Sequence, residues 1–118
     1  MAIPTALLRR FYVNNSLHSN GNNLSLKLTN RIAPTTLVSL GPIEIDDNLY
    51  APDRVTVIAS RPRSANEITE RSPLVLPMGK TITIQVAPST LKPGRHHVVI
   101  HAITQEVGSV SIEFDDYA

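Results

Sequence analysis

The sequence predicts an all-β fold, an antiparallel β-sandwich of seven to eight short strands. Two observations predict it: apolar and polar residues alternate along much of the chain, and turn-forming residues recur between the alternating segments. Alternation with a period of two is typical of strands that bury one face and expose the other. The nine prolines argue against a helical bundle, because proline interrupts helices. An immunoglobulin-like arrangement would suit such a sandwich, and a small barrel is the alternative.

Eight segments are expected to form strands. The alternation is clearest in residues 24–29, 54–57, 81–86 and 109–114. A fifth segment, 97–104, is more apolar, and three weaker candidates are 8–13, 36–40 and 43–46. Turn-forming residues separate the segments at Asn20-Gly21-Asn22, Gly41-Pro42, Ala51-Pro52-Asp53, Pro77-Met78-Gly79 and Lys92-Pro93-Gly94. A chain of 118 residues can bury one core, so residues 1–118 are predicted to form a single domain.

The composition excludes several classes of partner and chemistry. A net charge of +1 provides no broad basic surface for nucleic acid or an anionic membrane. The absence of cysteine removes disulfides, thiolate catalysis and sulfur-ligated metals, and it fits a reducing compartment. Residues 1–13 lack the apolar core of a signal peptide, and no apolar run approaches the roughly 20 residues that cross a bilayer, so a cytoplasmic location is expected. Charged residues make up 18%, against roughly 25% in soluble domains, which fits a protein that hides part of its surface in a complex.

Three of the four histidines lie close together, as His96, His97 and His101, and invite a metal hypothesis. Strand geometry argues against it, because His96 and His97 would point to opposite faces of a strand. His97 and His101 would share a face but stand about 13 Å apart, whereas bonds from a metal to its ligands are about 2 Å long. We therefore predict no metal site in this chain and interpret these residues as hydrogen-bonded strand or interface histidines, one of which could face a partner's active site.

No pattern in the sequence predicts a catalytic or cofactor-binding site. The paired acids Asp46-Asp47 and Asp115-Asp116 would face away from each other on a strand and are interpreted as solvated strand ends. The sequence contains no nucleophile elbow, phosphate-binding loop or dinucleotide-binding motif. Aromatic residues are few and tryptophan is absent, which disfavours an autonomous carbohydrate-binding module, because such modules present exposed rings to sugars.

The longest irregular segment, 60–73, is the candidate functional loop. It contains three arginines, Arg61, Arg63 and Arg71. In one interpretation it is a surface crossover in which Ser64 and Glu67 cap a short helix and the arginines are solvated or paired with acidic neighbours. In the other, Arg61 and Arg63 dock on a carboxylate-rich surface of another protein, since arginine is enriched at interfaces. The three arginines are therefore the candidate partner interface.

Over most of its length the sequence resembles the small β subunit of bacterial C-glycoside deglycosidases. Three segments carry the likeness: Leu24-Ser25-Leu26-Lys27-Leu28, then 31–45 with Pro34 and Gly41-Pro42-Ile43-Glu44-Ile45, and finally Leu91-Lys92-Pro93-Gly94 leading into His97-Val98-Val99. Each segment alone occurs in many β-sandwiches, so the resemblance rests on their order and spacing in a chain of this size.

The resemblance implies a β-sandwich subunit of a two-component enzyme that cleaves the carbon–carbon bond between a sugar and an aromatic aglycone. The larger α subunit would be a TIM barrel that holds a divalent metal ion, expected to be manganese, and the catalytic residues. The implied substrates are C-glucosides of flavonoids or related phenolics, oxidised beforehand at the 3-position of the sugar. The new carbonyl acidifies a neighbouring C–H and permits elimination of the aglycone, with the metal stabilising the enediolate.

We therefore expect a non-catalytic accessory subunit of a carbon–carbon lyase, and no catalytic residue is carried over to this chain. The subunit would brace the loops of the barrel and wall off part of the substrate pocket, using one sheet face or the 60–73 segment as the contact. Two other classes stay open: an autonomous carbohydrate-binding or adhesion module, and an unrelated structural or assembly protein.

Overall fold

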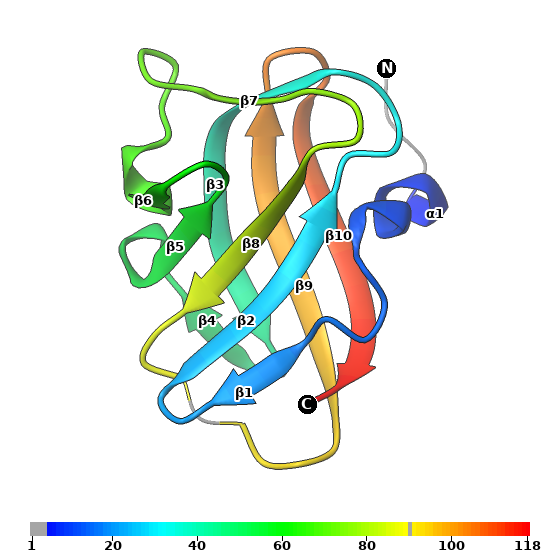
Figure 1. The fold of residues 1–118 in the computed structure, drawn as a ribbon, viewed down its shortest axis with the longest axis vertical. Helices are drawn as coiled ribbons and strands as arrows, with labels where there is room; N and C mark the ends of the chain where they lie inside the picture. Colours follow the sequence, from blue (N-terminus) through cyan, green and yellow to red (C-terminus); the bar gives the residue numbers. More distant parts are fainter. Residues whose placement is uncertain (1–4, 90) are drawn as a thin grey trace.

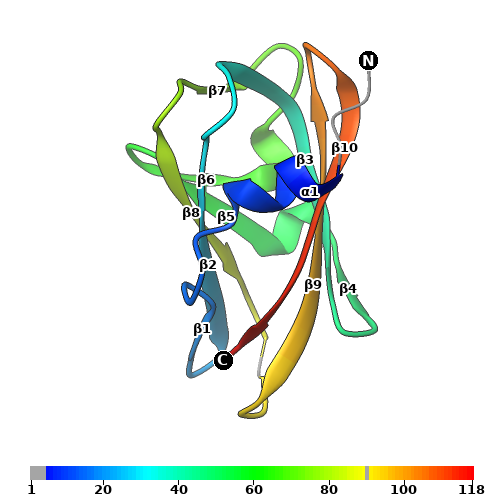
Figure 2. The same cartoon turned by 90° about the vertical axis from the view of Figure 1, so that its right-hand side faces the viewer.

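Two antiparallel sheets of five strands each pack face to face (Figure 1 and Figure 2). The computed structural model describes residues 5–89 and 91–118. The first sheet has the spatial order β1 (His18–Asn20), β2 (Asn23–Thr29), β8 (Thr81–Val86), β5 (Val55–Ile58) and β6 (Pro62–Ser64). The second sheet has the order β10 (Gly108–Tyr117), β9 (Arg95–Thr104), β3 (Thr35–Ile45) and β4 (Asn48–Tyr50), and β7 (Leu74–Leu76) also pairs with β3.

Helical structure is confined to short segments between or before the strands. These are α1 (Thr5–Leu8) and the 3₁₀ helices η1 (Arg9–Phe11), η2 (Pro52–Arg54) and η3 (Ala65–Glu67). Within residues 5–89 and 91–118, none of the helices has the length and apolar character needed to span a membrane.

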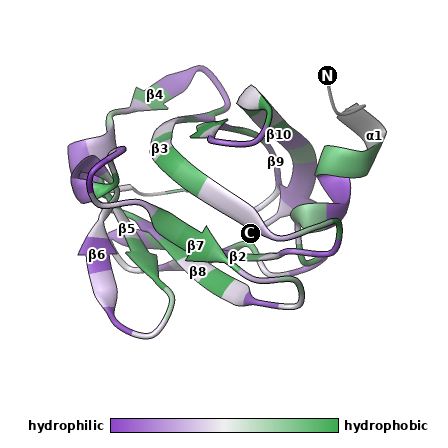
Figure 3. Ribbon diagram, turned by 90° about the horizontal axis from the view of Figure 1, so that it is seen from above, coloured by the Kyte–Doolittle hydropathy of each residue, from purple (hydrophilic) through white to green (hydrophobic). Residues whose placement is uncertain are grey.

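The predicted fold class is confirmed, and the alternative of a small barrel is wrong. Seen from above, the sheets form two separate layers (Figure 3). The orders β2-β8-β5 and β10-β9-β3-β4 correspond to the strand orders B-E-D and G-F-C-C′ of an immunoglobulin-like sandwich. The chain has no cysteine and no tryptophan, so this sandwich forms without the disulfide and buried indole of antibody domains.

The structure contains ten strands rather than seven to eight. The additional strands β1, β4, β6 and β7 have three residues each, too few to show a clear alternation in the sequence. Conversely, the two predicted strands 36–40 and 43–46 are parts of one strand, β3, which continues through Gly41-Pro42 with a shift of register against β9. Gly41 has a φ of 98°, and a Cβ there would lie 3.1 Å from Cγ of Pro52, so glycine permits this bulge.

The prediction of a strand at residues 8–13 is wrong. This segment forms the end of α1 and then η1, and only Tyr12 pairs with a strand, through an isolated bridge to Leu28. Leu8 is buried and Phe11 is half-buried, whereas Arg9 and Arg10 between them are exposed. Burial that recurs three residues apart fits a helical turn rather than a strand. The segment lies at the edge where β2 and β10 border the gap between the layers (Figure 2).

The core is formed by the inward residues of the alternating strands. Leu24 and Ile84 in the first sheet and Ile43 and Val98 in the second have no exposed surface. Complete burial of one such side chain contributes roughly 1.5–3 kcal/mol to stability. Every buried side-chain nitrogen or oxygen of the described ranges has a hydrogen-bond partner.

Asp116 belongs to this interior, so its interpretation as a solvated strand end is wrong. It accepts hydrogen bonds from the hydroxyl of Tyr12 at 2.5 Å and from the backbone N–H of Asn15 at 2.9 Å. Burial, followed by the hydrogen bond to Asp116, raises the pKa of Tyr12 to about 12. Burial alone would raise the pKa of Asp116, but the hydrogen bonds it accepts outweigh burial and lower that pKa. The alternation along β10 is consistent with this position, because Asp116 follows Ile112 and Phe114 at the same two-residue spacing on the inward side.

Candidate functional site

The outer face of the second sheet carries two of the four histidines, His97 and His101, together with their polar partners. Along β9 the residues alternate, so that His96 is buried while His97 and His101 are half-exposed. The predicted opposite orientation of His96 and His97 is therefore confirmed. On the neighbouring strand β10, Asp115 lies directly across from His97, and Ser111 lies across from His101. The sheet register thus brings acidic and hydroxyl side chains to each outward histidine.

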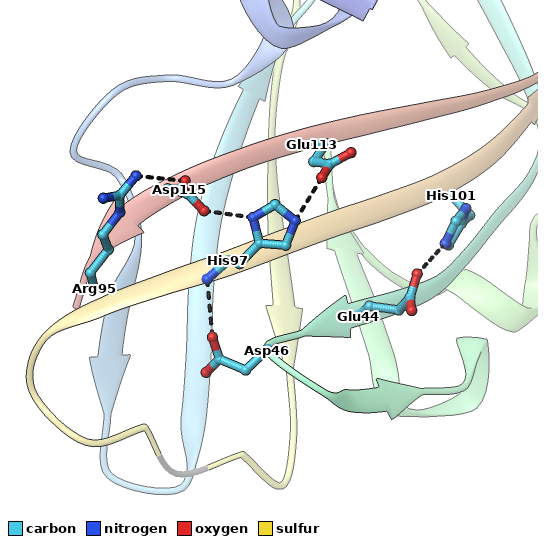
Figure 4. Close-up of polar contacts among 7 residues, drawn as sticks. All are labelled: Glu44, Asp46, Arg95, His97, His101, Glu113 and Asp115. Atoms are coloured by element: carbon cyan, nitrogen blue, oxygen red, sulfur yellow. Dashed lines mark hydrogen bonds and ion pairs between the residues drawn. The ribbon is translucent and has the colours of Figure 1, made fainter.

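His97 lies between two carboxylates (Figure 4). Its Nδ1 is 2.5 Å from Oδ1 of Asp115, and its Nε2 is 2.7 Å from Oε2 of Glu113. Two carboxylates on the two ring nitrogens require a proton on each nitrogen, so the imidazolium form fits this position. The hydrogen bond that His97 donates to Asp115, with a smaller contribution from Glu113, raises the pKa of His97.

Asp115 is shared between two cations. Its other oxygen lies 2.7 Å from the guanidinium of Arg95, which precedes His97 on the same face of β9 (Figure 4). The hydrogen bonds from His97 and then Arg95 lower the pKa of Asp115. Asp115 is partly exposed near the end of β10, as interpreted from the sequence, but it also contacts His97 and Arg95, which the sequence did not predict.

His101, four residues beyond His97 on β9, forms a second, smaller group of contacts. Its Nε2 lies 2.7 Å from Oε2 of Glu44 on β3, and its Nδ1 lies 3.0 Å from the hydroxyl of Ser111 on β10. Three strands thus contribute to one hydrogen-bonded row, of which Figure 4 shows the contact between His101 and Glu44. The ring is held in one orientation because both nitrogens are engaged.

Asp46, at the end of β3, connects this face to the interior. Its two carboxylate oxygens accept separate hydrogen bonds, one from the backbone N–H of His97 at 3.1 Å and one from Nδ1 of His96 at 2.8 Å. The other ring nitrogen of His96 is 2.7 Å from the carbonyl oxygen of Lys92. Both neighbours of the His96 ring are acceptors, which again requires a proton on each nitrogen. The hydrogen bond between them raises the pKa of His96 and lowers that of Asp46. Asp46 and Asp47 are exposed at the end of β3, as interpreted from the sequence, but the carboxylate of Asp46 also contacts His96 and His97.

We call the outer surface formed by six of these residues the histidine–carboxylate face. Its members are Glu44, Arg95, His97, His101, Glu113 and Asp115. Exposed apolar side chains stand beside them on the same side of the second sheet, at Leu49, Val75, Ile103 and Tyr117. Leu49 is 65% exposed and lies across from Glu44, and Ile103 is 43% exposed and lies two residues beyond His101. The face therefore combines charge with uncovered apolar area.

The contacts of this face limit what its two histidines can do chemically. Both ring nitrogens of His97 and of His101 are occupied by neighbouring side chains, which leaves neither ring free to take a proton from a substrate in this arrangement. Within the described ranges, no three His, Asp or Glu side chains are grouped so that they could hold a metal ion.

The three arginines predicted as a partner interface lie in or next to β6 and η3. Arg63 is engaged within the chain: its guanidinium donates to the carbonyl of Ser72 at 2.9 Å, to the hydroxyl of Ser72 at 2.8 Å and to the carbonyl of Glu67 at 3.2 Å. Arg63 thus ties the 60–73 segment together. Arg61 and Arg71 are exposed, and a contact with a partner at these two residues stays a prediction.

The same segment contains the expected short helix. It is η3, and the Ser64 hydroxyl accepts a hydrogen bond from the N–H of Asn66 at 3.3 Å. Glu67 contributes its carbonyl to Arg63 instead of a capping carboxylate. The first interpretation of the segment, a crossover with a capped short helix, agrees with the structure. Arg63, however, donates to carbonyl and hydroxyl oxygens and not to acidic side chains.

The histidines could be singled out from the sequence, but their contacts with acidic side chains could not. Glu44, Glu113 and Asp115 became significant only through pairing across strands, since Asp115 lies 18 residues from His97 and Glu44 lies 57 residues from His101. One signal was present: a hairpin turn between 104 and 108 aligns β9 with β10 and places Asp115 opposite His97.

Comparisons with known proteins give a matching family model and distantly similar solved structures. Residues 7–118 match the sequence model of a family described as "Hydroxymethylglutaryl-CoA reductase, N-terminal domain". No curated protein matches the chain. Among solved structures, a family 123 glycoside hydrolase from Clostridium perfringens, studied for glycolipid glycan hydrolysis, is 15% identical, with a TM-score of 0.36. The match covers 81% of this chain and 20% of that one, so the chain spans about a fifth of the hydrolase.

Proposed function

This chain belongs to the family described as the N-terminal domain of hydroxymethylglutaryl-CoA reductase, and from that premise we propose that it is a non-catalytic domain that contacts a larger catalytic component. The contact surface in this proposal is the histidine–carboxylate face with its exposed apolar neighbours. The family description itself names a part of an enzyme, which supports an accessory role.

One observation carries the proposal: the exposed apolar side chains are gathered on one side of the sandwich. Of the large hydrophobic residues described as exposed, Leu49, Val75, Ile103 and Tyr117 lie on the outer side of the second sheet. The outer side of the first sheet contributes none of them within the described ranges. Apolar area mixed with fixed charges is typical of the surface that a protein partner covers.

The charges of the face define the chemistry of the surface that it would meet. The face contains Glu44, Glu113 and Asp115 against a single arginine, Arg95. The two histidines add positive charge only when they are protonated. A partner surface with arginine or lysine side chains at its rim would complement this arrangement.

The partner that we propose is the TIM-barrel α subunit of a C-glycoside deglycosidase. The support is the resemblance of segments 24–28, 31–45 and 91–99 to the small subunit of those enzymes. In this proposal the α subunit contributes the divalent metal ion, manganese, and the catalytic residues, and the complex acts in the cytoplasm. It cleaves the carbon–carbon bond of 3-oxo-C-glucosides of flavonoids or related phenolics.

Two variants with matched charge test the contact surface. Leu49→Asp with Ile103→Asp places two carboxylates on the outer side of the second sheet, and Thr56→Asp with Thr83→Asp places two on the outer side of the first sheet. The chain is co-expressed with the product of its neighbouring gene, and the complex is isolated by affinity purification of the partner. The first pair is expected to lower the yield of complex at least tenfold, because a buried unpaired charge is costly, and the second to leave it unchanged. Equal yields from both pairs, or loss from the second pair only, would refute the contact surface.

Activity of the isolated complex separates this partner from a second candidate. The family match favours a reductase component as that candidate, because the family is described by its reduction of hydroxymethylglutaryl-CoA. The complex is assayed with a 3-oxo-C-glucoside and Mn²⁺, and separately for the reduction of hydroxymethylglutaryl-CoA. Release of the aglycone supports the deglycosidase, and reduction of the thioester supports the reductase. Binding of a C-glucoside by the isolated chain in calorimetry would instead favour an autonomous carbohydrate-binding module.

A further inference from the structure

A cavity of about 180 Å³ lies between the two sheets at the end of the sandwich next to α1 and η1. Both layers contribute to its wall, Leu28 and Ile82 from the first sheet and Ile100 and Ala102 from the second. Leu8 and Phe11 close it along the edge between β2 and β10. The wall is almost entirely aliphatic or aromatic.

The size of the cavity matches a small organic group. Protein interiors contain few voids larger than a water molecule, and an empty one removes contacts from every residue in its wall. An apolar cavity of about 150 Å³ in another protein stays dry and admits benzene. A volume of about 180 Å³ therefore has room for a benzene ring with one or two further carbon atoms.

Two charged residues also belong to the lining, Lys80 and Glu106. Lys80 is half-buried and Glu106 is exposed, which places both at the mouth. Glu106 is already engaged, since its carboxylate accepts the backbone N–H of Thr36 at 2.9 Å. Lys80 makes no ion pair within residues 5–89 and 91–118. The mouth thus offers one ammonium group that the described part of the chain does not neutralise.

Near the mouth, basic side chains outnumber the one carboxylate of the lining, Glu106. Arg9, Arg10 and Arg31 line a separate cleft together with Tyr12 and Asn14. The same two chain segments line both hollows, because Leu8 and Phe11 flank the two arginines of η1, and Ile32 follows Arg31. Cations near a cavity with apolar walls favour the binding of an anion.

We infer that this cavity binds a small amphipathic acid, whose ring or short alkyl chain lies between the sheets and whose carboxylate meets Lys80 at the mouth. This site is on the inside of the sandwich, so it is separate from the histidine–carboxylate face and does not depend on the proposed partner. The ligand is far smaller than a flavonoid glycoside.

Two probes with the same ring test the inference on the complete chain. Toluene provides the apolar group alone, and phenylacetate adds a carboxylate to it. Binding is followed by NMR of ¹³C-labelled isoleucine and leucine methyl groups. The methyl resonances of Ile82, Ile100 and Leu28 are expected to shift and saturate with both probes. Titrations with both probes that leave these resonances unmoved would overturn the inference.

Variants that fill the cavity and a variant at Lys80 test where the apolar end and the carboxylate of the ligand bind. Ala102→Leu adds three carbons inside the cavity and is expected to lower the affinity for both probes at least tenfold. Val110→Phe fills the cavity from β10 and replaces the first variant if circular dichroism shows that Ala102→Leu is unfolded. Lys80→Met is expected to weaken phenylacetate by about two- to fivefold, the value of an exposed ion pair, and to leave toluene unchanged. Thr83→Val, next to Ile82 but on the outer side of the first sheet, should alter the binding of neither probe. Undiminished binding to both filled cavities, or equal weakening of the two probes by Lys80→Met, would contradict the assignment.

Discussion

The two outer faces of the sandwich differ although their strands follow the same alternation. The outward residues of the three central strands of the first sheet are Asn23, Ser25, Lys27, Thr29, Thr56, Ile58, Thr81, Thr83 and Gln85. Hydroxyl and amide groups dominate them, as in the pair formed by Thr29 and Thr81, whose hydroxyls are 2.8 Å apart. The outer side of the second sheet instead presents ion pairs and exposed apolar side chains.

The comparison indicates which features of the sheets are needed for folding and which are not. Both inner faces are apolar, because the core between them provides the stability. The hydroxyl and amide groups of the first outer face can hydrogen-bond to water without any charged network. Exposed charged networks and exposed apolar side chains, as on the second face, contribute little to stability, which is why the proposed function assigns this face to a contact with a partner.

The largest expected effect concerns the bond that joins the two sheets at their edge. Tyr12 bridges to Leu28 in the first sheet and donates its hydroxyl to Asp116 in the second. Tyr12→Phe removes a hydrogen bond to a buried charge and is expected to lower the free energy of unfolding by about 2–3 kcal/mol, measured by urea denaturation. Tyr117→Phe is the control, because Tyr117 is exposed, and it should change stability by less than about 0.5 kcal/mol. Equal losses in the two variants would show that the buried bond has no special role.

A smaller effect is expected where the second face reaches the interior. Asp46→Asn leaves the buried His96 without its carboxylate, and we expect a loss of about 1–2 kcal/mol, reduced because Asp46 is itself half-exposed. Asn tolerates the positive φ of 55° at this position, so the backbone is preserved. Asp47→Asn is the control at the exposed neighbour, measured by the same denaturation. If Asp47→Asn costs as much as Asp46→Asn, the contact with His96 is not the cause.

The pH dependence of stability should also come from the second sheet. The pKa values of His96 and His97 are raised, so their contribution is complete below about pH 6.5 and is lost as the pH rises through their folded pKa values. The pKa values of Asp46, Asp115 and Asp116 are lowered, so their contribution is present above about pH 4 and is lost on acidification. Thermal unfolding should therefore show a maximum between these limits. Asp46→Asn should flatten the decline on the alkaline side, and an unaltered decline would remove His96 from this account.

The smallest effect on stability is expected for exposed residues, and partner affinity then distinguishes the two faces. His101→Gln on the second face and Thr83→Val on the first should each change the free energy of unfolding by less than about 1 kcal/mol, because exposed pairs contribute little. In the complex with the partner, His101→Gln should lower affinity and Thr83→Val should not. Stability is measured by thermal unfolding and affinity by titration of the purified partner. Similar affinities for the two variants would mean that His101 and Glu44 lie outside the contact.

Several features could be predicted from the sequence because they follow a local rule. The alternation in 24–29 and 81–86 predicted β2 and β8 and their inward residues, and the same rule placed His96 and His97 on opposite faces. The turn at Asn20-Gly21-Asn22 connects β1 and β2 as expected from its residue types. In each case the residue's own neighbours along the chain determine its position.

The site itself depended on contacts that no local rule describes. Asp46 meets His96 across 50 residues, and Tyr12 meets Asp116 across 104. The helical turn at 8–11 and the use of Arg63 within its own loop were also missed, because both depend on a cavity edge and on carbonyls brought close by folding.

The sequence by itself therefore determined the strands, their buried faces and the all-β class, since alternation is a property of consecutive residues. Only the tertiary structure decided which side chains meet on the second outer face and what space remains between the sheets. The physical reason is that register across strands, set by the turns and by the bulge at Gly41, determines which outward residues become neighbours.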